Sequence, residues 1–170
     1  MIILGVDPGT AVTGYGVVER RDSGAVALLE CGVVRTEAGA PLPRRLREIH
    51  DGLAEVMGRH AVDVMAVEGV FFGKNVRTAI ILGHGRAAAL LAASLRDLPV
   101  AEYSPAEVKS AVVGTGRATK EQVQFMVQQL LRLKEPPRPA DAADGVAVAL
   151  CHCTAAALPT AAALRAGGAR

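Results

Sequence analysis

The chain has 170 residues, of which 51% are hydrophobic and 21% charged, and its formal net charge is +2 at pH 7. This length suits one well-packed domain, so we expect a single domain over residues 1–158 and a flexible tail over residues 159–170. The weak positive charge permits nucleic-acid binding without arguing for it. Three cysteines, no charged-then-apolar leader and no apolar run near the roughly 20 residues of a membrane span favour a reduced, cytoplasmic protein.

The first third of the chain predicts three consecutive strands. An apolar run over residues 1–6 leads directly into Asp7, and strand-like runs follow over residues 14–20 and 25–34. An Asp-Ser-Gly turn separates the last two runs. Short links between consecutive strands favour an antiparallel meander.

An amphipathic helix is predicted next. Apolar residues recur from Leu42 to Val56 in alternating steps of four and three, which is the spacing of one helical face. On this pattern Arg44, Arg45 and Arg47 belong to the solvent-facing side of the helix.

The rest of the chain alternates strands and helices and then ends in helices alone. The predicted elements are a strand over residues 63–68, a long helix over 75–95, a short strand over 99–103, helices that begin after Ser104 and Thr119, and a last helix over about 140–158. Both helix starts carry the residue pattern of a capping box. This order predicts an α/β fold, in which a mixed five-stranded sheet carries helices on both faces.

Four carboxylates occupy positions that require a partner. Asp7 and Glu68 each end an apolar strand, and Asp141 and Asp144 lie three apart on one face of an alanine-rich helix. If the first and fourth strands are neighbours, the two strand-end carboxylates emerge together and the last helix can lie against them. An unpaired buried carboxylate is costly, and hard oxygen ligands suit Mg²⁺ or Mn²⁺. The sequence therefore predicts a divalent-metal site.

Each carboxylate also has a simpler interpretation when it is taken alone. Asp7 opens an Asp-Pro-Gly turn, and Asp141 is placed to cap a helix after a proline-rich run. The four together favour hydrolysis of a phosphodiester, because two bridged cations activate a water and stabilise the leaving oxygen. In that scheme Asp7 bridges the two ions, Glu68 and Asp144 complete one shell each, and Asp141 positions the water or its metal.

The motifs that surround these carboxylates follow one another in a recognisable order. They are Ile3-Leu-Gly-Val-Asp-Pro-Gly-Thr10 with Thr13-Gly-Tyr-Gly16, Glu68-Gly-Val-Phe-Phe-Gly-Lys-Asn75, Val108-Lys109 with Val113-Gly-Thr-Gly116, Lys120, and Asp141-Ala-Ala-Asp144. This series resembles the RuvC family of Holliday junction resolvases over nearly the whole chain. The resemblance implies a ribonuclease-H-like fold, a homodimer, and symmetric nicking of two like-polarity strands at a four-way DNA junction. It also implies a role in bacterial homologous recombination and DNA repair beside a branch-migration helicase complex.

The resemblance further implies roles for individual residues. The four carboxylates would be the catalytic ligands of two Mg²⁺ ions, which Mn²⁺ could replace, and Lys109 and Lys120 would lie at the scissile phosphate and the backbone. Two glycines depart from the usual family pattern: Gly69 stands where a larger polar residue is common, and Gly145 stands where alanine is usual. Neither departure removes a metal ligand, but Gly69 makes the loop after Glu68 more pliable.

The segment after Glu68 is a candidate DNA-binding element. Phe71 and Phe72 are adjacent in a chain with only three phenylalanines, and neighbouring side chains on an extended loop point in opposite directions. By its place in the family pattern, Phe71 is the residue expected to stack on an unpaired base. The alternative is that both rings lie in the core or in a dimer interface. Lys74, Asn75 and Arg77 are candidates to hold phosphates, or else form a solvated helix start.

Two further motifs have less specific interpretations. Gly83, His84 and Gly85 interrupt a helical pattern, which favours close packing and suggests a contact with a second subunit. His84 fits such an interface better than the role of a general base. Cys151 and Cys153 lie two apart on a helix and so point about 200° apart, which argues against a shared metal ion.

Three other functions remain open on the sequence alone. Asp-x-Gly-Thr after a first strand also begins the actin and sugar-kinase ATPases, although those proteins enclose a nucleotide between two such domains. A junction-binding module without catalysis would have no reason to gather carboxylates near phosphates. Another ribonuclease-H-like nuclease could act on RNA instead, and nicking assays on junction, duplex and hybrid substrates would separate these possibilities.

Overall fold

The computed structural model describes residues 1–69 and 76–156, which contain five strands and five helices. In chain order the elements are β1 (Ile2–Asp7), β2 (Val12–Arg20), β3 (Val26–Arg35), α1 (Leu42–Arg59), β4 (Val64–Glu68), α2 (Val76–Ser94), β5 (Val100–Tyr103), α3 (Pro105–Val113), α4 (Lys120–Leu130) and α5 (Ala140–Ala155). The predicted order of strands and helices is confirmed. The predicted tail over residues 159–170 lies outside the described residues, and the domain boundary at residue 158 stays a prediction.

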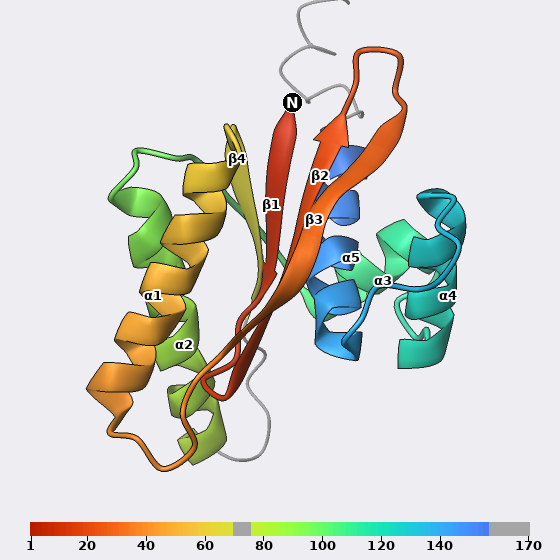
Figure 1. Cartoon of the computed structure of the whole chain (residues 1–170). Helices are drawn as coiled ribbons and strands as arrows, with labels where there is room; N and C mark the ends of the chain where they lie inside the picture. The colour runs from red at the N-terminus through yellow and green to blue at the C-terminus, as the bar shows by residue number, and fades with distance from the viewer. Residues whose placement is uncertain (70–75, 157–170) are drawn as a thin grey trace, which may run out of the picture.

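The five strands form one mixed sheet in the order β3-β2-β1-β4-β5. The β1–β2 and β2–β3 pairs are antiparallel, as the meander predicts, whereas β4 runs parallel to both β1 and β5. The predicted adjacency of the first and fourth strands is therefore correct. The strands β1 and β4 lie side by side in the sheet (Figure 1). Because they are parallel, their last residues, Asp7 and Glu68, lie at the same end of the sheet.

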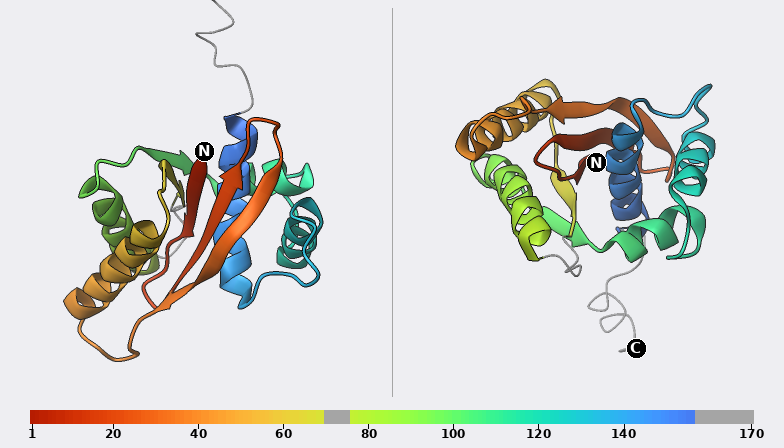
Figure 2. Two further views of the ribbon diagram at one scale, coloured as in Figure 1. Left: turned by 45° about the horizontal axis from the view of Figure 1, so that its top comes forward. Right: turned by 90° about the horizontal axis from the view of Figure 1, so that it is seen from below.

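Helices cover both faces of this sheet. In Figures 1 and 2, α1 and α2 lie on one side of the strands, and α3, α4 and α5 lie on the other. Each side has its own hydrophobic core: Leu4, Val6 and Val67 face the α1 and α2 side, whereas Ile3 and Ala66 face the α5 side. Both α3 and α4 begin with a capping box, centred on Ser104 and Thr119 as the sequence predicts.

The alternation of side chains along β1 decides which face receives its carboxylate. Successive residues of a strand point to opposite faces, so Ile3, Gly5 and Asp7 share one face. Ile3 belongs to the core beneath α5, and a Cβ added at Gly5 would overlap Gly145 and Ala149 of that helix. Asp7 is therefore directed to the α5 side. In β4 the same rule carries Glu68 to that side, two residues after the buried Ala66.

Glycines allow α5 to approach the sheet closely. A Cβ added at Gly14 would overlap the backbone carbonyl of Asp141, and one at Gly16 would lie 2.4 Å from Val146. On the helix itself, a Cβ at Gly145 would lie 2.5 Å from the Cα of Tyr15. This close contact between α5 and β2 fixes the distance of the first turn of α5 from Asp7.

One expectation about hydropathy is wrong. Within residues 1–69 and 76–156, helix α2 is long and apolar enough to span a membrane by length and composition alone. This is weak evidence for a span, because a face of α2 packs within the protein. Its buried residues are Gly85, Ala88, Ala89, Ala92 and Ala93, and the alanines among them belong to the core that α1 and the sheet also line.

Candidate active site

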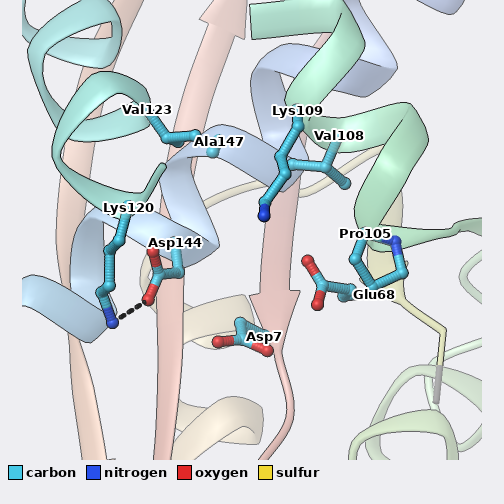
Figure 3. A pocket seen from close by; sticks show the side chains of 9 residues that line it. All are labelled: Asp7, Glu68, Pro105, Val108, Lys109, Lys120, Val123, Asp144 and Ala147. Carbon is cyan, nitrogen blue, oxygen red and sulfur yellow. Dashed lines mark ion pairs between the residues drawn. The ribbon is translucent and has the colours of Figure 1, made fainter. Parts of the chain in front are cut away.

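Asp7 and Glu68 stand side by side at the end of the sheet where β1 and β4 finish. They line a cavity of about 290 Å³ on the α5 face of the sheet. Figure 3 shows the two carboxylates directed into the same space, with that of Asp144 facing them from α5. Three carboxylates predicted from separate parts of the sequence therefore meet in one cavity.

Asp144 and Asp141 reach this region from the first two turns of α5. Asp144 lines the cavity, whereas Asp141 lies beyond it, with a side chain that is 42% exposed against 21% for Asp144. Lys120, the first residue of α4, joins the two: its Nζ lies 2.7 Å from Asp144 Oδ2 and 3.4 Å from Asp141 Oδ1. The structure thus places Asp141 at the rim of the group.

Both predicted lysines belong to the same cavity. Lys109 projects from α3, and its ammonium points into the space between Asp144 and Glu68 (Figure 3). Lys120 closes the other side through its ion pair with Asp144. Val108, Val123 and other apolar side chains form part of the wall, which lowers the local polarity around the charges.

Asp7 and Glu68 have higher pKa values than ordinary surface acids, because they are buried close to other carboxylates. Burial, helped by the negative charges of Asp7 and Asp144 and opposed by Lys109, raises the pKa of Glu68 to about 7. Burial likewise raises the pKa of Asp7 to about 6, with Asp144 adding to the effect and Lys120 opposing it. Two lysines therefore do not fully compensate the negative charge of the cavity.

This donor set fits a hard divalent cation in charge and chemistry. Its oxygens are carboxylates, and the raised pKa values of Asp7 and Glu68 record a repulsion that a cation would relieve. In the two described ranges, however, no three His, Cys, Asp or Glu side chains are placed to ligate one ion together. The Lys120 ammonium instead pairs with two of the carboxylates, those of Asp141 and Asp144.

The loop that follows Asp7 is held by a residue that the sequence pattern misassigned. Arg45 was expected on the solvent-facing side of α1, but it is only partly exposed, and its Nη2 donates to the backbone oxygen of Thr10 at 2.6 Å. Arg44 and Arg47 are exposed, as expected. The helical pattern alone gives no signal for this contact, because the partner loop lies 35 residues away in the sequence.

The predicted DNA-binding segment is described only in part. Phe71, Phe72, Lys74 and Asn75 lie outside the described residues. Arg77 is exposed in the first turn of α2, as a residue available to a phosphate must be.

The three residues suggested for a dimer interface have different surroundings. His84 is exposed and lines an apolar groove between α1 and α2, and Gly83 has no neighbouring atom within 4 Å of an added Cβ. Gly85 is buried, and a Cβ there would lie 3.2 Å from Gly9 and Thr10. Gly85 thus packs against the loop after Asp7 in the same chain.

The cysteines behave as buried thiols. Cys151 and Cys153 are buried in α5, and burial raises the pKa of each to about 11. His152 lies between them in sequence, and its Nδ1 shares a hydrogen bond of 2.8 Å with the Tyr103 hydroxyl. Cys151 and Cys153 are therefore ordinary buried thiols.

Comparison with known proteins decides the family. The family model described as "Crossover junction endodeoxyribonuclease RuvC" matches residues 3–152. This chain belongs to the RuvC family. The RuvC of Moorella thermoacetica is 54% identical over 154 residues, covering 91% of this chain and 92% of that protein. The RuvC of Desulforamulus reducens is 51% identical over 152 residues, covering 89% and 93%. Both relatives are named crossover junction endodeoxyribonucleases, so the chain is a member of a nuclease family, and this membership is consistent with divalent-metal dependence.

Solved structures agree with the assignment. T. thermophilus RuvC, in a structure described as a complex with a Holliday junction substrate, is 39% identical with a TM-score of 0.85, covering 92% of this chain and 94% of that one. The yeast mitochondrial Holliday junction resolvase Ydc2 is 14% identical with a TM-score of 0.62, which shows a shared fold alone. The predicted ribonuclease-H-like fold, with its antiparallel first three strands, is confirmed.

Proposed function

We propose that this RuvC family member resolves four-way DNA junctions by hydrolysing one phosphodiester in each of two strands of like polarity. The observation that carries the proposal is the shared cavity of Asp7, Glu68 and Asp144, which brings β1, β4 and α5 together beside two lysines. A site that only bound DNA would be weakened by carboxylates near phosphates. A hydrolytic site needs them, because they hold cations at the scissile bond.

Four residues would hold the metal. Asp7, Glu68 and Asp144 face the cavity, and Asp141 reaches its rim through Lys120. Two Mg²⁺ ions, or Mn²⁺ in their place, would supply a water nucleophile at neutral pH and neutralise charge on the leaving oxygen. In this proposal Asp7 would bridge the ions, Glu68 and Asp144 would complete one shell each, and Asp141 would position the water or its metal.

The lysines would hold the substrate. The Lys109 ammonium points into the space that the carboxylates surround, where a scissile phosphate must enter (Figure 3). Lys120 stands at the edge of the same cavity and is 47% exposed, so it can reach the neighbouring backbone phosphate. Positive charge at this point also offsets the repulsion between DNA and the carboxylates.

Symmetric nicking calls for two such sites, and we infer a homodimer. Helix α2 leaves Ile80, Ile81 and Leu91 exposed, and Leu95 just after the helix is exposed as well, on a face that the described residues do not cover. Beside it, an apolar groove of about 440 Å³ runs between α1 and α2 and includes His84. A second copy that buried this surface would relate the two cavities by a two-fold axis, as a four-way junction requires.

The remaining assignments rest on the family resemblance. Phe71 would stack on a base at the centre of the junction, with Phe72 packed inward, and Lys74, Asn75 and Arg77 would bind phosphates beside it. We also infer a cytoplasmic protein that works with a branch-migration helicase complex in recombination and repair. Co-purification of that complex with the tagged protein would test the last inference.

Substrate selectivity tests the proposed function. The wild-type protein is incubated with Mg²⁺ and a labelled four-way junction, a linear duplex of the same sequence, or an RNA/DNA hybrid. Paired nicks at symmetric positions of the junction, with little cleavage of the other two substrates, are expected. Preferential cleavage of the hybrid would instead support a nuclease that acts on RNA.

A further inference from the structure

The backbone of the loop between β1 and β2 is anchored at Thr10 by two donors from distant segments. Its carbonyl oxygen accepts a hydrogen bond from Thr36 Oγ1 at 2.7 Å and another from Arg45 Nη2 at 2.6 Å. The Arg45 Nε also donates to Thr36 Oγ1 at 2.9 Å, so the three groups form a closed triangle. Helix α1 and the segment after β3 thereby hold one point of the loop.

The same loop is fixed from two other sides. Thr13 is fully buried, and its hydroxyl donates to the carbonyl oxygen of Gly9 at 2.7 Å. Gly85 of α2 packs against Gly9 and Thr10, where an added Cβ would lie only 3.2 Å away. Thr10 itself is 7% exposed. Residues 8–11 are thus a clamped connection between the two strands.

This clamp matters because Asp7 is the last residue of β1 and is paired with a neighbouring strand on one side only. Pairing with β2 extends to Asp7, which lies opposite Gly14, but pairing with β4 ends one residue earlier, at Val6. On the β4 side the backbone after Val6 has no strand partner among the described residues. The direction of the Asp7 carboxylate therefore depends on how the next three residues are held.

We propose that Arg45 is a positioning residue for Asp7, which acts through the Thr10 carbonyl to fix the direction of that carboxylate in the cavity. The inference rests on the proposed function, in which Asp7 is a metal ligand. In sequence, Arg45 lies 38 residues after Asp7 and 23 residues before Glu68. Its helix, α1, packs on the face of the sheet opposite to the cavity (Figure 1). Loss of a residue that orients a ligand typically lowers metal affinity or activity by about 10- to 100-fold.

The test compares variants on the same helix. Arg45→Met keeps the length of the side chain and removes both donors, and Arg45→Lys restores one donor that can reach Thr10. Thr36→Val removes the second donor to the same carbonyl. Arg44→Met is the matched control, because Arg44 is exposed and pairs only with Glu37 and Glu48 among the described residues.

Two measurements separate positioning from a general loss of stability. Mn²⁺ binding to the DNA-free protein is followed by electron paramagnetic resonance, and kcat and KM for junction cleavage are measured at a temperature where every variant is folded by circular dichroism. Arg59→Met serves as a destabilised control, because it breaks the contacts of Arg59 with Glu30 at a distance from the loop.

Arg45→Met is expected to weaken Mn²⁺ binding and lower kcat by about tenfold or more, with KM unchanged, and Thr36→Val is expected to do the same to a smaller extent. Arg45→Lys should recover part of the loss, and neither control should change Mn²⁺ binding. A folded Arg45→Met protein with the Mn²⁺ affinity and kcat of the wild type would overturn the inference. If the wild type itself neither bound Mn²⁺ nor cleaved, the proposed function would fail instead.

Discussion

The Nζ atom of Lys120 lies 2.7 Å from Asp144 Oδ2, inside a cavity that Asp7 and Glu68 also line. Its pair with Asp144 raises the pKa of Lys120, so the ammonium stays charged at neutral pH. Together with Lys109 it supplies two positive charges to a group of four carboxylates. A divalent cation bound to Asp144 would compete with this ammonium for the same oxygens.

This competition gives a first prediction. Lys120→Met should raise the Mn²⁺ affinity of the DNA-free protein by about 1.4- to fivefold, which corresponds to the ~0.2–1 kcal/mol of a partly exposed ion pair. Cleavage should nevertheless fall, because a phosphate contact is lost. Calorimetric titration with Mn²⁺ measures the affinity. Arg117→Met removes an exposed charge from the same region and should leave metal binding unaltered; an unchanged or weaker affinity in Lys120→Met would reject the competition.

The raised pKa values predict a pH dependence of stability without metal. Asp7 titrates near pH 6 and Glu68 near pH 7 in the folded protein, above their ordinary values of 3.8 and 4.5. The folded state therefore binds protons more tightly than the unfolded state between about pH 4 and 7, and the contribution of these groups to stability falls as pH rises through that window. In EDTA, the contribution of these two groups to the Tm of the protein should be smaller at pH 8 than at pH 5.

Other groups titrate nearby, so a variant isolates this effect. Burial lowers the pKa of His152, which gives a slope of opposite sign below its ordinary value of 6.5. Glu30, whose pKa is lowered to about 2 chiefly by Arg59, loses its stabilising effect only below pH 4.5. The difference in Tm between Glu68→Gln and wild type should therefore grow from pH 5 to pH 8 in favour of the variant. A constant difference would argue against the shifted pKa of Glu68.

The close packing of α5 on the sheet predicts that alanine in place of glycine destabilises the protein in this helix but stabilises it in α1. Gly145→Ala should lower the free energy of unfolding by about 1–3 kcal/mol, because the new methyl group meets the backbone of Tyr15. Gly58→Ala in α1 meets only Arg96 Nη2 at 3.7 Å and should raise it by about 0.5–1 kcal/mol. Urea titrations measure both. Equal effects at the two sites would mean that α5 is not held so closely.

A single charge on α2 tests the proposed dimer. Leu91 is 53% exposed and lines the groove between α1 and α2, so Leu91→Glu should convert a dimer to a monomer in sedimentation velocity. Leu130→Glu alters an equally apolar residue, 44% exposed, on α4 at the other side of the sheet, and should remain a dimer. A wild-type protein that sediments as a monomer would remove the basis of the proposal.

The fold and the main site were predictable because the residues that build them repeat simple patterns. Strand-end carboxylates at Asp7 and Glu68 indicate a shared edge once β1 and β4 are taken as neighbours, and two acids three apart on α5 indicate one face. The capping boxes at Ser104 and Thr119 fixed the starts of α3 and α4. These signals are local, so one sequence is enough to recognise them.

The contacts that a single sequence could not supply join distant segments. Arg45 carries the same pattern as its exposed neighbours, and only the folded chain shows that it reaches Thr10. Gly85 was suggested for a subunit contact, which stays a prediction, and only the folded chain shows its close contact with the loop after Asp7. The helix predicted over residues 75–95 agrees closely with α2, but its apolar character was underestimated, because glycines and a histidine interrupt a sequence that is otherwise rich in alanine and leucine.

The most direct test of the proposed catalytic site compares the wild type with Asp7→Asn on a labelled four-way junction, with Mg²⁺, with Mn²⁺ and with EDTA. We predict paired nicks by the wild type with either metal and none with EDTA. Asp7→Asn should bind the junction with unchanged affinity in a mobility-shift assay, but its cleavage rate should fall by about 10²-fold or more. Cleavage by Asp7→Asn at the wild-type rate, or cleavage that persists in EDTA, would contradict the account.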